Sequence, residues 1–175
     1  MVETFFDIAT LVVIVVTAYI AVRHLREGTQ SRRETHEWNR RIETQRALFA
    51  FQIEIKGAWK ALDSKFDYHD DGNPVTANEV KAAFIEDGEL KTHLFDMLNF
   101  YEAIARGIDF KIYDEEMVKA ARKNAMIRVA NYFRPYIRQY RREKNPHAWI
   151  KFTSLIEGWK KADSVNVPSG RDRLG

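Results

Sequence analysis

The chain has 175 residues, of which 28 are Lys or Arg and 25 are Asp or Glu, and its formal net charge is +3. It contains no cysteine, which excludes disulfides, thiolate metal sites and cysteine nucleophiles. Only eight glycines and four prolines interrupt a sequence rich in Ala, Leu, Ile, Lys, Arg and Glu, and this composition predicts an all-α fold.

The residues from Phe5 to Val22 form an apolar run in which Asp7 is the single charged residue. As a helix this run is about 27 Å long, close to the hydrocarbon thickness of a bilayer. No Lys or Arg precedes it and no small-residue cleavage site follows, which favours an uncleaved anchor over a secretory signal peptide. We therefore expect residues 1–24 to form a transmembrane anchor, with its helix continuing into a cytoplasmic helical bundle.

Basic residues follow the apolar run and predict its orientation. The membrane-proximal ones are Arg23, Arg26, Arg32 and Arg33. Because Lys and Arg beside a span tend to stay on the cytoplasmic side, we expect the N-terminus outside and the rest of the chain in the cytoplasm, at the inner membrane. Anionic lipid headgroups are the expected partners of these arginines, and residues 25–47 are interpreted as a basic helical stalk.

Residues 23–66 should form one long helix with at most one break, and Gly28 is the expected hinge. Its apolar residues recur at i, i+4, i+7 and i+11, in a stripe made of Trp38, Ile42, Gln45 and Phe49. A helical cytoplasmic domain is expected over residues 48–163. The polar tail of residues 164–175 is expected to be disordered.

The middle of the chain alternates turn formers with helical patterns. Thr76 and Glu79 match a capping box and predict a helix over residues 77–86. A second helix should follow from Glu89 to Arg106, ended by Gly107. The apolar connection over residues 108–113 is expected to pack against the core.

The last third predicts two further helices and an interruption. Asp114 is the expected N-cap of a helix that runs to about Arg134, where Pro135 should break or kink it. Asn145 and Pro146 match an N-cap followed by proline, and predict the start of the final helix.

Charge is distributed unevenly along the sequence. Fifteen acidic and seven basic residues lie between Glu54 and Glu116, whereas nine basic residues and one acidic residue lie between Lys119 and Lys144. Two helical layers with complementary faces would explain this pattern. A basic surface that binds anionic lipid or nucleic acid is the other interpretation.

Four arginines of the basic segment alternate with tyrosines, and they are the candidate anion-binding face: Arg134, Arg138, Arg141 and Arg142. Interleaved cations and aromatic rings are typical of nucleic-acid binding. The tyrosines, however, have helical spacing, which favours an amphipathic helix with tyrosines inward and arginines in water. Nucleic acid is therefore not the favoured partner.

Asn99 and Glu102 interrupt the apolar face of the predicted 89–106 helix. We interpret them as a buried polar pair bound to a neighbouring helix, with Arg128 or Arg134 as the expected partner. A polar pocket is the functional alternative for the same two residues.

Asp67 to Gly72 resembles the start of a calcium loop, but His69 and Asn78 replace two required ligands, so an ordinary turn is expected. No phosphate-binding glycine loop, nucleophile elbow or paired histidine motif is present. We therefore expect no metal, no cofactor and no enzyme activity. A hydrolase that uses buried carboxylates remains an alternative to which no residue is assigned.

Three stretches resemble an uncharacterised bacterial and phage family, one of the domains of unknown function: Leu98–Ile108, Tyr113–Glu116 and Tyr132–Ile137. The resemblance implies an N-terminal membrane helix followed by a small helical cytoplasmic domain. It implies no reaction, because the three stretches contain packing and capping residues.

These observations predict a single-pass, non-catalytic interaction module, with copies of itself or another cytoplasmic protein as partner. The alternative is a membrane effector or sensor that binds an anionic ligand or nucleic acid through a basic helical face. Phage defence or superinfection exclusion would be the setting of that alternative.

Overall fold

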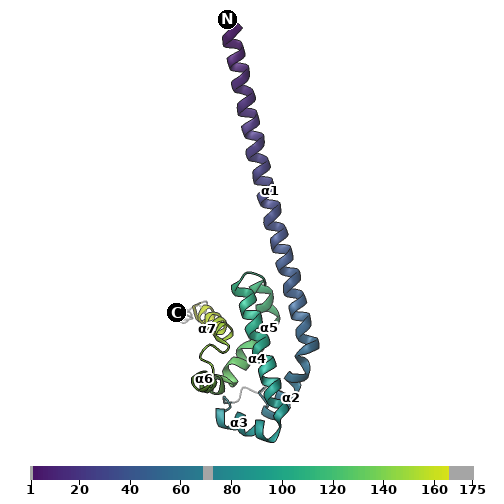
Figure 1. Ribbon diagram of the computed structural model, residues 1–175, viewed down its shortest axis with the longest axis vertical. Coiled ribbons are helices and arrows are strands. Elements are labelled where there is room, and N and C mark those ends of the chain that lie inside the picture. Colours follow the sequence, from purple (N-terminus) through teal and green to yellow (C-terminus); the bar gives the residue numbers. More distant parts are fainter. Residues whose placement is uncertain (1, 69–72, 166–175) are drawn as a thin grey trace, which may run out of the picture. The chain divides into compact units, whose positions relative to one another are not determined.

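The computed structural model describes residues 2–68 and 73–165 of the chain (Figure 1). In this part there are seven helices and no strand: α1 (Val2–Glu54), α2 (Lys56–Phe66), α3 (Ala77–Glu86), α4 (Gly88–Asp109), α5 (Glu115–Tyr132), α6 (Arg134–Glu143) and α7 (Ile150–Val165). The all-α fold is thus confirmed. The chain divides into two compact units, Met1–Arg40 and Arg41–Gly175, and each is described by itself.

The predicted anchor lies within α1, whose backbone is helical from Val2 to Glu54. Among the residues searched, which are those that the structure describes, no helix contains a stretch apolar and long enough to span a bilayer. The side chains of residues 2–16 lie outside the described part, and most of the run from Phe5 to Val22 falls there. The predicted disordered tail also falls outside it, apart from Ser164 and Val165, which belong to α7.

The long helix has one break, but the prediction placed it at the wrong residue. Helix α1 ends at Glu54 and α2 starts at Lys56, whereas Gly28 lies inside α1. A single glycine lowers helix stability by about 1 kcal/mol without ending a helix, which explains why Gly28 does not act as a break. Ile55 at the junction is buried in the core.

Two stripes with the same helical spacing run along the C-terminal part of α1. The inner stripe consists of Thr44, Leu48, Phe51 and Ile55, and all but the half-buried Leu48 are buried. In the stripe predicted from the sequence, by contrast, Phe49 keeps 63% of its surface accessible to solvent. Spacing alone did not tell which of two equivalent stripes packs on the bundle.

Helix α4 occupies the centre of the 41–165 bundle and packs against α2, α3 and α7 (Figure 1). Its inward side chains lose all solvent contact, as seen for Leu94, Met97, Leu98 and Tyr101. Each buried side chain of this size contributes about 1.5–3 kcal/mol of hydrophobic stabilisation. The surface of α4 therefore positions α2, α3 and α7.

Helix α4 continues past Gly107 and ends at Asp109, contrary to the prediction. A Schellman motif closes it, because the amides of Lys111 and Ile112 donate to the carbonyls of Ile108 and Gly107 at 3.0 and 2.8 Å. Lys111, rather than a glycine, adopts the left-handed conformation with φ of 61°. The exposed hairpin-like turn that results leaves Phe110 and Ile112 in solvent, so the prediction of a packed connection was wrong for both side chains.

Gly107 is required by packing and not by its backbone conformation. A Cβ at this position would lie 2.1 Å from Cδ2 of Tyr113, the ring that covers this turn of α4. No glycine among the described residues has positive φ.

Asp114 connects the start of α5 to α1. Its side chain accepts from the amides of Glu116 and Met117, which confirms it as the N-cap. Its own amide donates to Oγ1 of the buried Thr44 at 2.6 Å, and Arg41 lies 4.0 Å from its carboxylate. One residue therefore caps α5 and holds α1 against it.

The other predicted helix ends are confirmed in part. Thr76 and Glu79 form the expected capping box of α3. Phe133 separates α5 from α6, and Pro135 lies in the first turn of α6. Helix α7 begins at Ile150, later than predicted, because Asn145 accepts the amide of His147 in a preceding turn.

We predict opposite effects of adding a methyl group at two glycines. Gly107→Ala forces the Tyr113 ring to move and should lower the free energy of unfolding by about 1–3 kcal/mol. Gly158→Ala in α7 meets no atom within 4 Å and should raise it by about 1 kcal/mol. Denaturant unfolding of the full chain, followed by far-UV circular dichroism, measures both, and equal effects would contradict the role of Tyr113.

Candidate functional site

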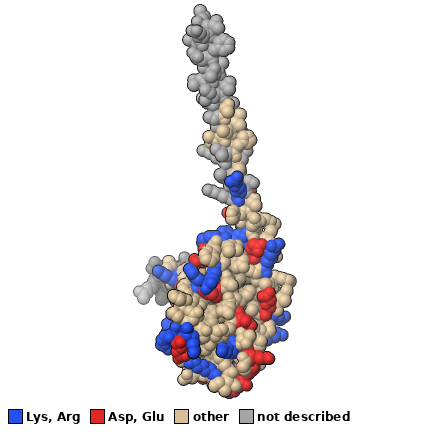
Figure 2. Space-filling model, in the orientation of Figure 1, with Lys and Arg blue, Asp and Glu red and all other residues tan. Residues whose placement is uncertain are grey.

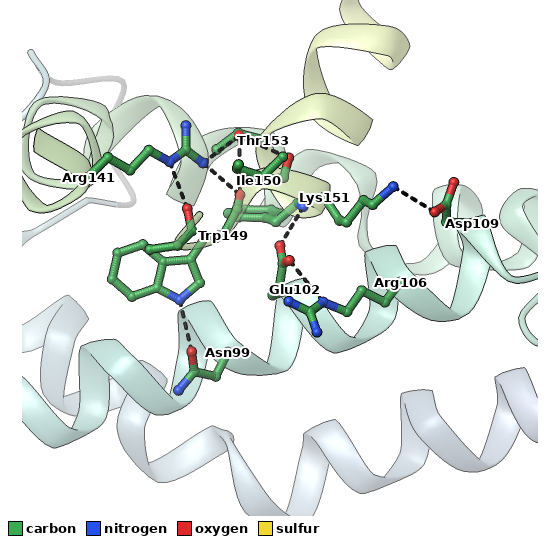
Figure 3. Close-up of polar contacts among 11 residues, drawn as sticks. Asn99, Glu102, Arg106, Asp109, Arg141, Trp149, Ile150, Lys151 and Thr153 are labelled. Carbon is green, nitrogen blue, oxygen red and sulfur yellow. Dashed lines mark hydrogen bonds and ion pairs between the residues drawn. The ribbon is translucent and has the colours of Figure 1, made fainter. Parts of the chain in front are cut away.

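The buried carboxylate of Glu102 caps the N-terminus of α7 (Figure 3). Its Oε2 accepts the amide of Phe152 at 2.8 Å, and its Oε1 accepts Nε of Arg106 at 3.0 Å. Phe152 is the third residue of α7, so its amide has no carbonyl partner within the helix. A carboxylate at this place also interacts favourably with the helix dipole.

Arg141 of α6 holds the segment that leads into α7 (Figure 3). Its guanidinium donates to the carbonyls of Ala148 and Trp149 at 2.7 and 2.8 Å, and to the Thr153 hydroxyl at 2.8 Å. Burial lowers the pKa of Arg141, and the nearby negative charge of Glu102 opposes this shift. The guanidinium is thus used inside the fold.

Trp149 has the left-handed conformation with φ of 53°, which is unusual for a large side chain. Its indole donates to Oδ1 of Asn99 at 2.9 Å and packs against the rings of Phe95 and Tyr140. Such strain costs about 1–3 kcal/mol and persists only where surrounding contacts compensate for it. The contacts of Trp149 and Arg141 supply that compensation.

Asn99 and Glu102 therefore belong to one cluster, but not as predicted. Glu102 is buried with 7% of its surface exposed, whereas Asn99 is exposed. Their partners are the start of α7 and Arg106 rather than Arg128 or Arg134. The sequence showed where the apolar face of α4 is interrupted but not which helix lies across it. We name Asn99, Glu102, Arg106, Arg141, Trp149 and Thr153 the α7 clasp.

Three of the four arginines of the predicted anion-binding face, Arg134, Arg138 and Arg142, line one hollow. Arg134, Arg138 and Arg142 are exposed, whereas Arg141 belongs to the α7 clasp. Tyr136 is buried, which raises its pKa to about 12, and Tyr132 and Tyr140 are half-buried. Apart from Arg141, helix α6 thus has tyrosines inward and arginines outward, which is the arrangement that the sequence favoured.

Charges of both signs are mixed over the face of the bundle seen in Figure 2. Arg134 of α6 lies 3.8 Å from Glu157 of α7. The visible face therefore presents no continuous basic surface.

The remaining candidate residues are described only in part. Arg23 and Arg32 are exposed, whereas the side chains of Arg26 and Arg33 lie outside the described residues. Residues 69–72 of the calcium-like turn lie outside them as well. Over the described ranges, no three His, Asp or Glu side chains are grouped so that they could hold a metal ion.

A family model for a domain of unknown function, DUF4760, matches residues 6–159 of the chain. The chain belongs to this family. The match includes the first half of the chain, which lies outside the three stretches that carried the resemblance. Searches of curated proteins and of solved structures found no match to the DUF4760 chain.

The sequence did not predict the exposure of the outer stripe of α1 in this DUF4760 domain, which consists of Trp38, Ile42, Gln45, Phe49 and Ile53. Phe49 and Ile53 keep 63% and 69% of their surfaces accessible, and Ile42 is half-buried. Trp38, one helical turn before Ile42 in the sequence, is exposed too. The helical spacing of these residues indicated that they share one face of α1. We interpreted that face as packed within the domain.

We predict that Glu102→Ala lowers the free energy of unfolding by about 1–3 kcal/mol, because the buried Phe152 amide and the Arg106 guanidinium lose their acceptor. Glu157→Ala is the matched control: its carboxylate is exposed, and its loss should cost about 0–1 kcal/mol. Denaturant unfolding of the full DUF4760 chain measures both, and equal costs would contradict the capping role of Glu102.

Proposed function

We propose that the chain is a bacterial or phage protein that spans the bacterial inner membrane once. It holds a helical interaction domain at the cytoplasmic surface, without catalysis. The apolar run from Phe5 to Val22 supports the anchor, and the arginines that follow support the orientation. Anionic lipid headgroups would be the partners of Arg23, Arg26, Arg32 and Arg33.

The exposed outer stripe of α1 carries the proposal of an interaction role. Within the 41–165 unit, Phe49 and Ile53 present large apolar side chains to solvent from a regular helix. Burying a side chain of this kind stabilises a complex by about 1.5–3 kcal/mol. A partner that covers the stripe therefore gains affinity without a conformational change in the bundle. Solvent-exposed apolar side chains that share one helix face are typical of helix–helix association.

The proposed partner is a second copy of the chain. Two copies anchored in one membrane have the same orientation, so their α1 helices are parallel. Equivalent residues then meet across the dimer axis, with Ile42 and Phe49 in apolar layers and Gln45 in a polar layer that fixes the register. Another cytoplasmic protein is the alternative occupant of the stripe.

The anchor is tested by membrane extraction. The full chain should stay in the membrane pellet after alkaline carbonate washing, whereas deletion of residues 1–24 should release it. Because the chain has no cysteine, Val2→Cys and Asp163→Cys give clean single labelling sites. An impermeant maleimide should label Val2→Cys from outside and Asp163→Cys only after lysis; carbonate release of the full chain contradicts the anchor, and the reverse labelling contradicts the orientation.

The dimer is tested by cysteine cross-linking in membranes. Gln45→Cys should form an intermolecular disulfide on mild oxidation, because parallel α1 helices bring the two copies of this residue together. Ile85→Cys is the control, since Ile85 on α3 is 87% exposed and lies away from the stripe. Adding Phe49→Glu should abolish the Gln45→Cys cross-link. A monomeric Gln45→Cys variant, or equal cross-linking of Ile85→Cys, contradicts the second copy as partner.

A further inference from the structure

Arg122 of α5 has a desolvated guanidinium nitrogen without a partner. Its Nε is buried and makes no hydrogen bond within the described part of the chain. The guanidinium carbon lies 4.0 Å from the centroid of the Phe51 ring, a cation–π contact that supplies no hydrogen-bond acceptor. A buried guanidinium nitrogen without an acceptor is costly, and the Arg122 residue as a whole is half-buried.

The hydroxyl of Tyr101 is a second unsatisfied group near the same place. It is fully buried and has no hydrogen-bond partner among the described residues. The Tyr101 ring stacks on Phe51 with centroids 5.8 Å apart, and Phe51 is the ring beneath Arg122. Burial raises the pKa of Tyr101, and the positive charge of Arg122 partly offsets this shift.

Arg122 borders a cleft between α2 and α5 with a volume of about 470 Å³. The lining side chains include four cations and no carboxylate. Trp59 and Tyr68 form its aromatic side, with their rings in edge contact at 6.3 Å. Its volume lies within the range of small-molecule sites.

Two of the other cations already have carboxylate partners outside the lining of the cleft. Lys119 lies 3.2 and 2.8 Å from Glu115 and Glu116, and Lys123 lies 2.6 Å from Asp163. No ion pair is found for Arg122 within the described residues. The hollow between α6 and α7 differs from this cleft in its charge. Glu157 lines it, and its Arg141 is already bound within the α7 clasp.

We propose that this cleft binds a nucleoside monophosphate, with the phosphate at Arg122 and the base against Trp59. Guanidinium nitrogens and phosphate oxygens match in geometry and charge, and the base gains a flat apolar wall. The inference is independent of the proposed membrane interaction role.

Isothermal titration of the full chain with AMP and GMP tests the site, with adenosine, inorganic phosphate and glycerol phosphate as comparison ligands. A nucleoside monophosphate should bind most tightly and adenosine least. Arg122→Met keeps the apolar stem over Phe51 and should weaken binding at least about tenfold. Arg138→Met removes an exposed arginine of α6 and should leave binding unchanged.

If circular dichroism shows that Arg122→Met is poorly folded, a second variant keeps the test decisive. Trp59→Leu should weaken nucleotide binding and leave inorganic phosphate binding unchanged, because only the base contacts the indole. Absence of nucleotide binding, or equal binding by Arg122→Met, overturns the proposal. Glycerol phosphate binding as tightly as AMP overturns the nucleotide assignment and indicates a lipid headgroup instead.

Discussion

The arrangement of the C-terminal half depends on one buried carboxylate, that of Glu102. A charged group in a core is tolerated only where its oxygens are fully used, and here a helix amide and a guanidinium use them. Asp114 follows the same logic at the start of α5. The two buried acids of the described chain thus each fix the N-terminus of a helix. Their hydrogen bonds set the positions of these helices along their axes, which apolar packing alone does not.

The basic segment illustrates how charge can have a structural role instead of a binding one. Arg141 donates hydrogen bonds to the carbonyl oxygens that precede α7, and Arg134 lies near Glu157. Neither contact joins the acidic segment Glu54–Glu116 to the basic one, so the complementary layers expected from the sequence stay a prediction. Arg122 differs, because the described residues that line its cleft include no carboxylate.

Local chemistry made much of the fold predictable from the sequence. The capping box at Thr76, the cap at Asp114 and the interruption near Pro135 each depend on a few neighbouring residues. The errors arose where distant residues decide. Gly107 was read as a helix end because the Tyr113 ring that excludes a side chain there could not be placed. The partners of Glu102 and the exposure of Phe49 likewise depend on which helices pack together.

Phe49 and Phe51 are two residues apart on α1, yet one is exposed and the other lies in the core. Two independent selection pressures therefore act on one stretch of α1. Substitutions on the inner stripe are constrained by the bundle, whereas those on the outer stripe are constrained only by whatever covers it. Substitutions on the exposed face of α1 can therefore change what that face binds, while the bundle retains its stability.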